Sequence, residues 1–478
     1  MTLKIPASIF REYDIRGIAG RDLSPEFAEA LGLAYAHYLK NKVGNLGRNP
    51  KVSVGKDCRV TGDSYSEALA KGMLRGGLDV VRLGTCPTPL TYFSLFHLNL
   101  EGGIMVTGSH NPADYNGFKV GVGRETLHGH QIQELRALME KGVKPADRPG
   151  TISDFAIIPP YIDQLVKNAR KLTKKKIVID AGNGTAGNVA PELFERLGAD
   201  VIPLFCELDG RFPNHHPDPT VPANLKQLVD KVLQEKADFG IAFDGDSDRI
   251  GVVDEKGRIL FGDELMVVFA RNVLKDKPGA TIISEVKSSH RLYNDITAKG
   301  GNAIMWKTGH SLIKSKMKET KAALAGEMSG HIFFADRYFG YDDAIYAALR
   351  FYEIACDAKG PASSLVADLP PVVATPEIRV DCEENLKFKL VEETKKRITD
   401  GNGHDLKITD IDGVRADFGD GWGLVRASNT QPVLVLRFEA PTQGRLAEIR
   451  HRMEDALHQA AAAIGHPPVK TDGSGGAH

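Results

Sequence analysis

The sequence predicts an α/β protein with three similar α/β domains that contain mixed sheets, followed by a smaller α+β domain at the C-terminal end. The first observation is a plan that recurs three times between residues 51 and 331: a strand, a helix, a glycine-containing turn, a second strand and then a third. The second is that each third strand opens into a polar loop. The third is a change of pattern after residue 370, where short strands replace the repeated plan. Strands that alternate with helical patterns favour mixed or mostly parallel sheets covered by helices.

The three copies can be aligned by their strands. The first strands lie in KVSVG, KKIVIDAGNG and ATIISEVKSS, at 51–55, 175–184 and 280–289. The glycine turns and second strands lie in RGGLDVVRLG, RLGADVIPLF and AKGGNAIMWKTG, at 75–84, 196–205 and 298–309. The third strands and their loops are GIMVTGSHNP, FGIAFDGDSDR and AALAGEMSGH, at 103–112, 239–249 and 322–331. Such repetition is hard to obtain from three independent accidents, so it indicates one structural unit used three times.

Domain boundaries are expected between the copies. Pro159 and Pro160 begin the run into the second copy, a turn at 254–257 separates the second copy from the third, and prolines at 370–376 precede the last segment. That last segment reads as short strands closed by a helix near 443–464. We therefore expect domains at 1–153, 154–256, 257–369 and 370–464, followed by a flexible polar tail at 465–478.

Composition restricts the class of partner. The 478 residues carry a net charge of −1 with 26% charged residues, so nothing in the overall balance attracts nucleic acid or anionic lipid. No apolar run approaches the roughly 18 residues of a membrane span. The five cysteines form no CxxC or Cys/His cluster, which favours reduced thiols and argues against zinc. We expect a cytoplasmic protein that acts on a small molecule and binds neither membrane nor nucleic acid.

The stretch GGIMVTGSHNPADYNGFK, at 102–119, joins a buried strand to a loop that cannot continue a sheet. Ser109 lies in this loop, and Lys119 follows ten residues later. The crevice beyond the carboxyl ends of such strands is where reactive groups collect in α/β sheets. A serine near a cation could accept a phosphoryl or acyl group, although a serine in a turn most often serves the turn itself.

A second strand is followed by three carboxylates, Asp244, Asp246 and Asp248, which alternate with small residues. A turned backbone could aim all three at one point, as a hard divalent cation requires. A core would not keep three such charges unpaired. We therefore favour a metal site over the alternative of an acidic surface turn.

Four loops together resemble the signature loops of the α-D-phosphohexomutases. They are TGSHNP, DGDSDR, GEMSGH and RASNTQP, at 107–112, 244–249, 326–331 and 426–432. The third and fourth loops are similar to those of the bacterial phosphomannomutase/phosphoglucomutase branch, and the likeness extends from Phe10 to about residue 460. The resemblance implies four domains around a central cleft and an enzyme that is a monomer or a weak homodimer.

The fourth loop supplies groups suited to a phosphate dianion. Arg426 offers a guanidinium fork, and Ser428, Asn429 and Thr430 offer two hydroxyls, an amide and backbone N–H groups. A short polar loop between strands usually means only a turn. The resemblance assigns these four residues to phosphate binding.

The third loop supplies groups suited to a sugar. Glu327 can accept two hydrogen bonds from neighbouring sugar hydroxyls, and Ser329 and His331 could join it. The structural alternative is a capped turn with an exposed carboxylate. In the resembled family this loop contacts O3 and O4, which glucose and mannose share.

Further candidates come mainly from the resemblance. Lys287 and His310 each lie just beyond a strand of the third copy, so both could face the same crevice. The resemblance implies that His310 contacts the substrate and could transfer a proton. In FREYDIRG, at 10–17, Tyr13 and Arg16 are expected in a loop ahead of the first copy. The resemblance implies that Tyr13 touches the substrate and that Arg16 helps the transfer.

The implied reaction is a reversible transfer of phosphate between O1 and O6 of a hexose, either glucose or mannose. Ser109 would carry the phosphate at rest, and transfer to the sugar would give a hexose 1,6-bisphosphate, the intermediate and activator. Mg²⁺ would be held by Ser109 and the three aspartates. Lys119, Arg16 and Arg249 are candidates for stabilising the transferring oxygens, and Lys119 or His310 for moving the hydroxyl proton.

Two rival interpretations of the acidic loop are open. In a haloacid-dehalogenase-type phosphatase or mutase, Asp244 would be the nucleophile and Asp246 the acid/base, but the Thr or Val expected after the second aspartate is missing. In a non-enzymatic calcium module, Glu255 would complete the loop, but Arg249 stands where glycine is required and the flanks read as strands.

Overall fold

The computed structural model describes residues 5–170, 172–400, 406–429, 431–467, 469 and 471. The chain forms two compact units. The first comprises Met1–Ile283, Ile296–Asn302 and Gly309–Ala367, and the second comprises Ser284–Asp295, Ala303–Thr308 and Asp368–His478. Lys287 therefore belongs to the same compact unit as Arg426.

The first sheet of the first unit is mixed. Its strands are β1 (Ile15–Ile18), β2 (Lys51–Lys56), β3 (Asp79–Thr85), β4 (Gly102–Val106), β5 (Tyr115–Val122), β6 (Glu125–Thr126) and β7 (Ile152–Asp154). They run in the order β1-β5-β4-β2-β3-β7, with β6 beside β5. Strands β3 and β4 flank β2 in parallel, whereas β5 pairs antiparallel with β4 and β1.

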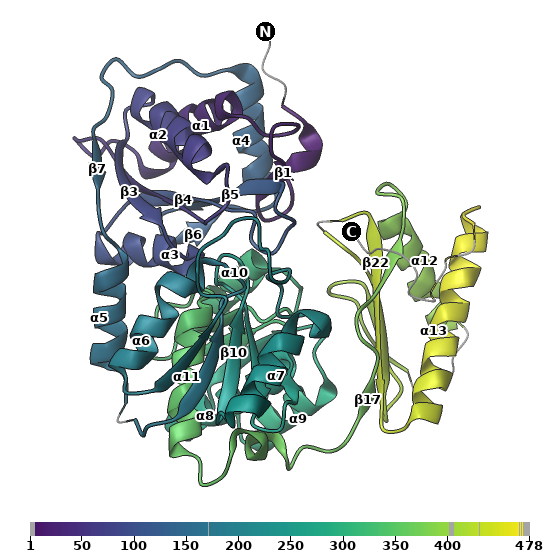
Figure 1. The fold of residues 1–478 in the computed structure, drawn as a ribbon. Coiled ribbons are helices and arrows are strands. Elements are labelled where there is room, and N and C mark those ends of the chain that lie inside the picture. Colours follow the sequence, from purple (N-terminus) through teal and green to yellow (C-terminus); the bar gives the residue numbers. More distant parts are fainter. Residues whose placement is uncertain are drawn as a thin grey trace. The chain divides into compact units, whose positions relative to one another are not determined.

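Helices cover both faces of this sheet (Figure 1). Three helices, α1 (Pro25–Val43), α2 (Gly62–Arg75) and α4 (His130–Lys141), lie on one face, and α3 (Thr88–His97) lies on the other. Ser24 begins α1 by accepting a hydrogen bond from the backbone N–H of Phe27, and Gly44 ends it at φ 71°. The buried faces of α1, α2 and α4 form one hydrophobic core with the strands.

The same strand order recurs in the next two sheets. The second sheet has β8 (Lys176–Asp180), β9 (Asp200–Leu204), β10 (Phe239–Phe243), β11 (Ile250–Asp254) and β12 (Ile259–Leu260). The third has β13 (Thr281–Glu285), β14 (Asn302–Trp306), β15 (Leu324–Gly326) and β16 (Ile332–Phe334). The three sheets share the orders β5-β4-β2-β3, β11-β10-β8-β9 and β16-β15-β13-β14. The internal repeat predicted from the sequence is thus confirmed, and each third strand ends at one of the predicted loops.

Seven more helices accompany the second and third sheets. They are α5 (Ile158–Asn168), α6 (Ala190–Arg196), α7 (Lys226–Glu235), α8 (Gly262–Asp276), α9 (His290–Ala298), α10 (His310–Thr320) and α11 (Ala344–Asp357). Short 3₁₀ turns lie at Ala7–Ile9, Thr185–Asn188, Pro222–Leu225 and Ala362–Val366. Asp343 begins α11 by accepting a hydrogen bond from the N–H of Tyr346.

The C-terminal part is α+β and is not a fourth copy. Its sheet contains β17 (Val373–Ala374), β18 (Ile378–Asp381), β19 (Lys407–Thr409), β20 (Val414–Asp417), β21 (Trp422–Ala427) and β22 (Val433–Ala440). The strands run β17-β22-β21-β20-β19, with β18 also beside β22, and all pairs are antiparallel. Helices α12 (Lys387–Asp400) and α13 (Gln443–Ala463) lie on one face of this sheet (Figure 1).

Two local expectations from the sequence need correction. Arg16 does not lie in a loop, because it is part of β1 and pairs with Gly117 of β5. Helix α12 was not predicted at all. Its apolar stripe of Leu390, Val391 and Ile398 is buried, but eight of its fourteen residues are charged and hide the helical pattern.

The sequence favours reduced thiols over disulfides or a zinc site. In the structure the five cysteines are free thiols. Within the described residues, none of the helices is long and apolar enough to cross a membrane.

Candidate functional site

Ser109 lies in the loop between β4 and β5, which crosses the end of the sheet. Its backbone adopts φ 49°, a left-handed conformation that is uncommon outside glycine. The N–H of Ser109 donates to Thr107 Oγ1 at 2.8 Å, and its hydroxyl donates to Asp244 Oδ2 at 2.8 Å. The side chain is 2% exposed. The fold therefore joins the predicted nucleophile to the predicted metal loop, 135 residues away in the sequence.

The acidic loop follows β10 and turns back on itself. Asp244 Oδ1 accepts hydrogen bonds from the N–H groups of Asp248 and Arg249, at 3.0 and 3.1 Å. This turn gathers one oxygen each of Asp244, Asp246 and Asp248, and the three oxygens lie within 4.8 Å of one another. All three side chains are buried.

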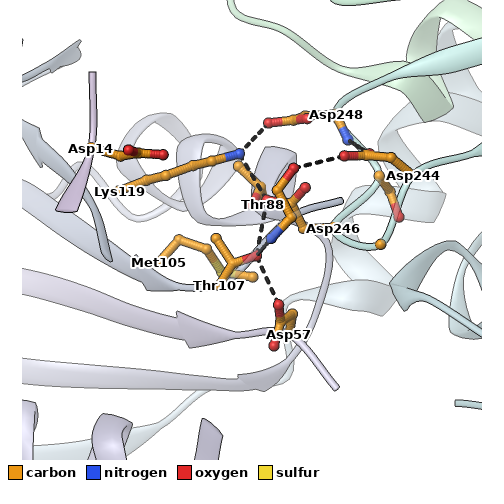
Figure 2. Close-up of polar contacts among 12 residues, drawn as sticks. Asp14, Asp57, Thr88, Met105, Thr107, Lys119, Asp244, Asp246 and Asp248 are labelled. Atoms are coloured by element: carbon orange, nitrogen blue, oxygen red, sulfur yellow. Dashed lines mark hydrogen bonds and ion pairs between the residues drawn. The ribbon is translucent and has the colours of Figure 1, made fainter. Parts of the chain in front are cut away.

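Lys119 extends from β5 to this cluster (Figure 2). Its Nζ donates to Asp246 Oδ2 at 2.8 Å and also to Asp248 Oδ2. Thr88 donates to the same Asp246 oxygen at 2.5 Å. Burial would lower the pKa of Lys119, but the two carboxylates outweigh burial and hold that pKa well above its ordinary value. Lys119 is therefore a fixed positive charge.

One ammonium does not balance three buried carboxylates. Burial and the charges of Asp246 and Asp248 raise the pKa of Asp244 well above its ordinary value. Among the described residues, neither Asp246 Oδ1 nor Asp248 Oδ1 has a hydrogen-bond partner, although both atoms are buried. Unpaired buried carboxylate oxygens are costly. The three aspartates, with the Ser109 oxygen beside them, therefore fit a hard divalent cation.

A second trio, Asp248, His331 and Asp342, also brings its ligand atoms within 4.8 Å of one another. However, Arg249 Nε donates to His331 Nε2 at 3.0 Å, so Nε2 must supply a lone pair and Nδ1 must carry the proton. The Nδ1 atom lies 3.2 Å from Asp342 Oδ2 and 3.6 Å from Asp248 Oδ1, without hydrogen-bond geometry to either oxygen. Because Nε2 is engaged by Arg249, we do not assign this trio to the metal and treat it as a polar neighbour of the acidic loop.

The same network reaches His310, the first residue of α10. The His310 ring lies 5.6 Å from the rings of both Tyr13 and His331. Asp342 lies 3.8 Å from His310 Nδ1 and 3.1 Å from Lys314 Nζ. Burial, with Lys314 adding to it, lowers the pKa of His310 well below its ordinary value. His310 is therefore neutral at physiological pH.

Glu327 and Arg16 also make contacts within the first unit. Glu327 Oε1 accepts a hydrogen bond of 2.6 Å from the N–H of Gly309, immediately before α10. Ser329 is half-buried in the loop that follows Glu327. Arg16 donates to Asn111 Oδ1 at 3.0 Å and to Asp14 Oδ2 at 2.5 Å, so it is tied to the Ser109 loop.

The second unit contains a separate basic cluster. Lys287 Nζ lies 3.0 Å from Glu377 Oε2 and 3.8 Å from Glu285 Oε1. Arg426 Nε donates to Asp412 Oδ2 at 3.1 Å. Burial would raise the pKa of Glu377, but Lys287 and the other cations around it lower that pKa to about 2. Each cation of this cluster already has a carboxylate partner.

Arg426 does not lie in the predicted loop, because it is part of β21 and pairs with Val435 of β22; Ser428 and Asn429 follow the end of that strand. The N–H of Ser428 donates to the carbonyl of Val433 at 3.0 Å, which closes the turn between β21 and β22. Thr430 lies outside the described residues. Buried arginines hold the Lys287 segment in this unit, because Arg415 donates to the carbonyl of Ser288 at 2.8 Å and Arg437 donates to that of Lys287.

Several residues of these clusters were not predicted. They are Asp57, Arg59, Thr88, Asp342, Glu377 and Asp412. Asp57, Arg59, Thr88 and Glu377 are 50 or more residues from the residues they contact, whereas Asp342 and Asp412 lie nearer but outside the loop motifs, so the motifs held no signal for any of them. The calcium-loop alternative fails in the structure, because β11 separates Asp248 from Glu255 and Glu255 instead accepts hydrogen bonds from Ser363.

Comparisons with known proteins assign the whole chain to one family. Phosphoglucomutase/phosphomannomutase alpha/beta/alpha domains I, II and III match residues 7–145, 159–257 and 261–373, and the C-terminal domain of that family matches 377–456. The chain is 47% identical over 464 residues to the phosphomannomutase/phosphoglucomutase of Pseudomonas aeruginosa, covering 97% of this chain and 98% of that protein. It is 44% identical over 454 residues to the phosphoglucomutase of Neisseria gonorrhoeae, covering 95% and 97%.

A solved structure is similar over nearly the same length. The phosphoglucomutase/phosphomannomutase family protein of Burkholderia thailandensis superimposes with a TM-score of 0.89 at 40% identity, covering 96% of this chain and 98% of that one.

Proposed function

Because the chain belongs to the phosphoglucomutase/phosphomannomutase family, within the α-D-phosphohexomutases, we infer that it interconverts hexose 1-phosphates and hexose 6-phosphates. The observation that carries the mechanism is the 2.8 Å hydrogen bond from Ser109 to Asp244, beside two carboxylate oxygens that have no hydrogen-bond partner among the described residues. A hydroxyl placed against a cation site suits a phosphoryl acceptor. The dehalogenase-type and calcium-binding alternatives find no support in the comparisons.

In the proposed reaction Ser109 carries the phosphate at rest. The free hydroxyl of a hexose phosphate attacks that phosphorus, the bond to Ser109 Oγ breaks, and a hexose 1,6-bisphosphate forms. The other phosphate of this intermediate then returns to Ser109, which restores the phosphoenzyme. Mg²⁺ held by Ser109, Asp244, Asp246 and Asp248 would neutralise charge on the transferring group.

Charge and protonation divide the roles among the neighbouring side chains. The fixed charge of Lys119 suits it to stabilise the transferring oxygens, together with Arg16 and Arg249. The low pKa of His310 leaves it neutral and able to accept the proton of the attacking hydroxyl. We assign the base to His310 and leave Lys119 as an electrostatic partner.

Recognition of the rest of the substrate is assigned to two groups. Tyr13, Glu327, Ser329 and His331 bind the sugar in this proposal. The phosphate that is not being transferred is bound by the cluster in the second unit, which includes Lys287, Arg426, Ser428, Asn429 and Thr430. In the second group a substrate phosphate would take the place of the carboxylates of Glu377 and Asp412.

The biological setting is inferred from the chain's composition. Five free thiols suit a reducing cytoplasm, and the near-zero net charge suits phosphosugars as the only partners. We infer a monomer or a weak homodimer, which sedimentation at several protein concentrations would test.

The test of the mechanism is intact-mass measurement followed by phosphopeptide mapping of enzyme incubated with hexose 1,6-bisphosphate. Phosphate on Ser109 is the expected result. Phosphate on Asp244 would favour the dehalogenase mechanism, and an enzyme that turns over without any covalent phosphate would overturn the proposal.

A further inference from the structure

Arg59 lies between β2 and α2, about fifty residues before the Ser109 loop, and belongs to none of the four loop motifs. Its side chain is 0% exposed. A guanidinium so completely buried needs hydrogen-bond partners; its four terminal N–H groups have them, whereas Nε has only the nearby charge of Asp57. Its partners are the backbone of the Ser109 loop.

The guanidinium of Arg59 binds three backbone carbonyls of that loop and the carbonyl of Tyr115, where β5 begins. Its Nη2 donates to the carbonyls of Ser109 and Asn111, at 2.8 and 2.5 Å. Its Nη1 donates to that of Tyr115 at 2.8 Å and to that of Pro112. The four terminal N–H groups of the guanidinium therefore face four carbonyls of the segment from Ser109 to Tyr115.

Asp57 completes this arrangement from the other side. Its carboxylate lies 3.3 Å from Arg59 Nε and accepts hydrogen bonds from Thr107 Oγ1 at 2.8 Å and from the N–H of Gly108 at 3.1 Å. Thr107 Oγ1 in turn accepts the N–H of Ser109. The Asp57–Arg59 pair thus engages both the carbonyls and the N–H groups of the loop around Ser109.

The loop needs such support because its conformation is unfavourable by itself. Ser109 is left-handed at φ 49°, and this conformation directs its hydroxyl to Asp244. The loop also packs directly on the guanidinium, since a Cβ added to Gly108 would lie 2.4 Å from Arg59 Cζ and Nε. The ring of Phe212 covers Arg59 at 5.2 Å.

We propose that Arg59 is the positioning residue of the phosphoserine loop: by binding four carbonyls it holds Ser109 in the conformation from which phosphate is accepted and given up. This proposal rests on the proposed function of Ser109. Lysine could not replace Arg59, because a single ammonium has three donors at one point and cannot reach four carbonyls in one plane.

The protein offers a matched control for a merely structural role. Arg350 is also 0% exposed, lies in the first unit, and donates to the carbonyl of Asp336 and to Asn272 Oδ1, at 3.1 and 2.9 Å. Arg350→Lys should therefore disturb packing to a similar degree as Arg59→Lys without touching the Ser109 loop.

The experiment compares wild type, Arg59→Lys and Arg350→Lys. The measurements are the Tm, the kcat and KM for a hexose 1-phosphate, and the rate at which hexose 1,6-bisphosphate phosphorylates Ser109, followed by intact mass. A misplacement of about 1 Å can cost roughly 100-fold in rate, so Arg59→Lys should lower kcat and the loading rate by about that factor. Its KM should stay within about threefold, and Arg350→Lys should lose Tm while keeping kcat and loading within about threefold.

The outcomes separate this proposal from the one it rests on. If wild type loads Ser109 and Arg59→Lys loads it equally fast, only the positioning role fails. If wild type carries its phosphate on another residue, both proposals fail. Should Arg59→Lys not fold, Gly108→Ala places a methyl group against the same guanidinium and should show the same loss of kcat and loading; normal loading in that variant would overturn the positioning role.

Discussion

The acidic cluster around Asp244 in the first unit and the basic cluster around Lys287 in the second unit are both buried, but their charges are balanced differently. The acidic cluster sets three carboxylates against the single ammonium of Lys119 and keeps two oxygens that lack hydrogen-bond partners among the described residues. In the second cluster, by contrast, each cation has a carboxylate partner: Lys287 lies beside Glu377 and Glu285, and Arg426 pairs with Asp412.

The difference teaches how a mutase can treat the two ends of one substrate. Under the proposed function, the excess negative charge of the first cluster would bind a cation at the place where chemistry occurs. In the proposed function, a phosphate that binds the second cluster has to displace a carboxylate from each cation, which lowers the affinity of the cluster for phosphate. A lower affinity suits a bisphosphate intermediate that must leave this cluster by one phosphate and bind again by the other.

The largest effect should come from the nucleophile. Ser109→Ala should lower turnover by on the order of 10⁴-fold or more, because no other group can accept the phosphate. Its Tm should stay close to that of wild type, and Ser66→Ala on the surface of α2 serves as the control. Comparable turnover in Ser109→Ala and Ser66→Ala would remove the phosphoserine from the mechanism.

The acidic cluster should respond next most strongly. Chelation by EDTA should abolish activity and added Mg²⁺ should restore it. Asp244→Asn, Asp246→Asn and Asp248→Asn should each weaken Mg²⁺ binding, measured by titration calorimetry, by at least about tenfold, since each removes one charge from an oxygen site. Asp230→Asn, at an exposed position on α7, should bind Mg²⁺ like wild type. An unchanged rate in EDTA would make the cluster structural.

The parts of the fold and of the candidate site that could be predicted are those that depend on neighbouring residues in the sequence. The threefold repeat, Ser109 and the three aspartates are recognisable because strand ends and polar loops are local patterns. The resemblance to known loops added Arg426, and Lys287 was a candidate because it lies just beyond a strand. The contacts that organise these residues could not be predicted. Arg59 binds carbonyl groups, which any sequence supplies, and Asp342 lies near His331 because its backbone forms a bridge with Phe333.

Sugar recognition should show a smaller and equal effect on two substrates. Glucose and mannose phosphates differ at C2, and a site that reads only O3 and O4 leaves nothing unpaired when O2 is inverted. Both 1-phosphates should be converted, with kcat/KM values within about two orders of magnitude. Glu327→Ala should lower both by similar factors. A preference of thousands, or a loss confined to one sugar, would show that this loop reads O2.

Phosphate binding by the second cluster can be tested by removing the carboxylate charge that pairs with Lys287. Glu377→Gln keeps the shape but leaves Lys287 less neutralised, so KM for a hexose phosphate should fall, by about three- to tenfold for one such pairing. Arg426→Lys should do the opposite and raise KM, because the guanidinium fork is lost. A rise in KM for Glu377→Gln would mean that the carboxylate helps to bind substrate and that the two clusters do not differ in the way described above.

The smallest effect concerns pH and the support of the acidic cluster. His215 lies on the segment that passes the acidic loop, where Pro217 approaches Gly245. Its Nε2 lies 3.1 Å from both oxygens of Asp180, and its Nδ1 lies 2.9 Å from the carbonyl of His216. Burial would lower the pKa of His215, but the hydrogen bond and charge of Asp180 outweigh burial and raise it above 6.5.

A histidine pKa that is higher in the folded state contributes stability that is fully present below about pH 6.5 and is lost as the pH rises through the folded value. The Tm difference between wild type and His215→Gln should therefore be largest near pH 6 and shrink steadily toward pH 9. His37→Gln, at an exposed position on α1, should give a difference that does not follow this trend. A His215→Gln difference that stayed constant or grew with pH would show that His215 forms no ion pair with Asp180 in the folded protein. The stability of the segment beside the acidic loop would then not depend on pH through this histidine.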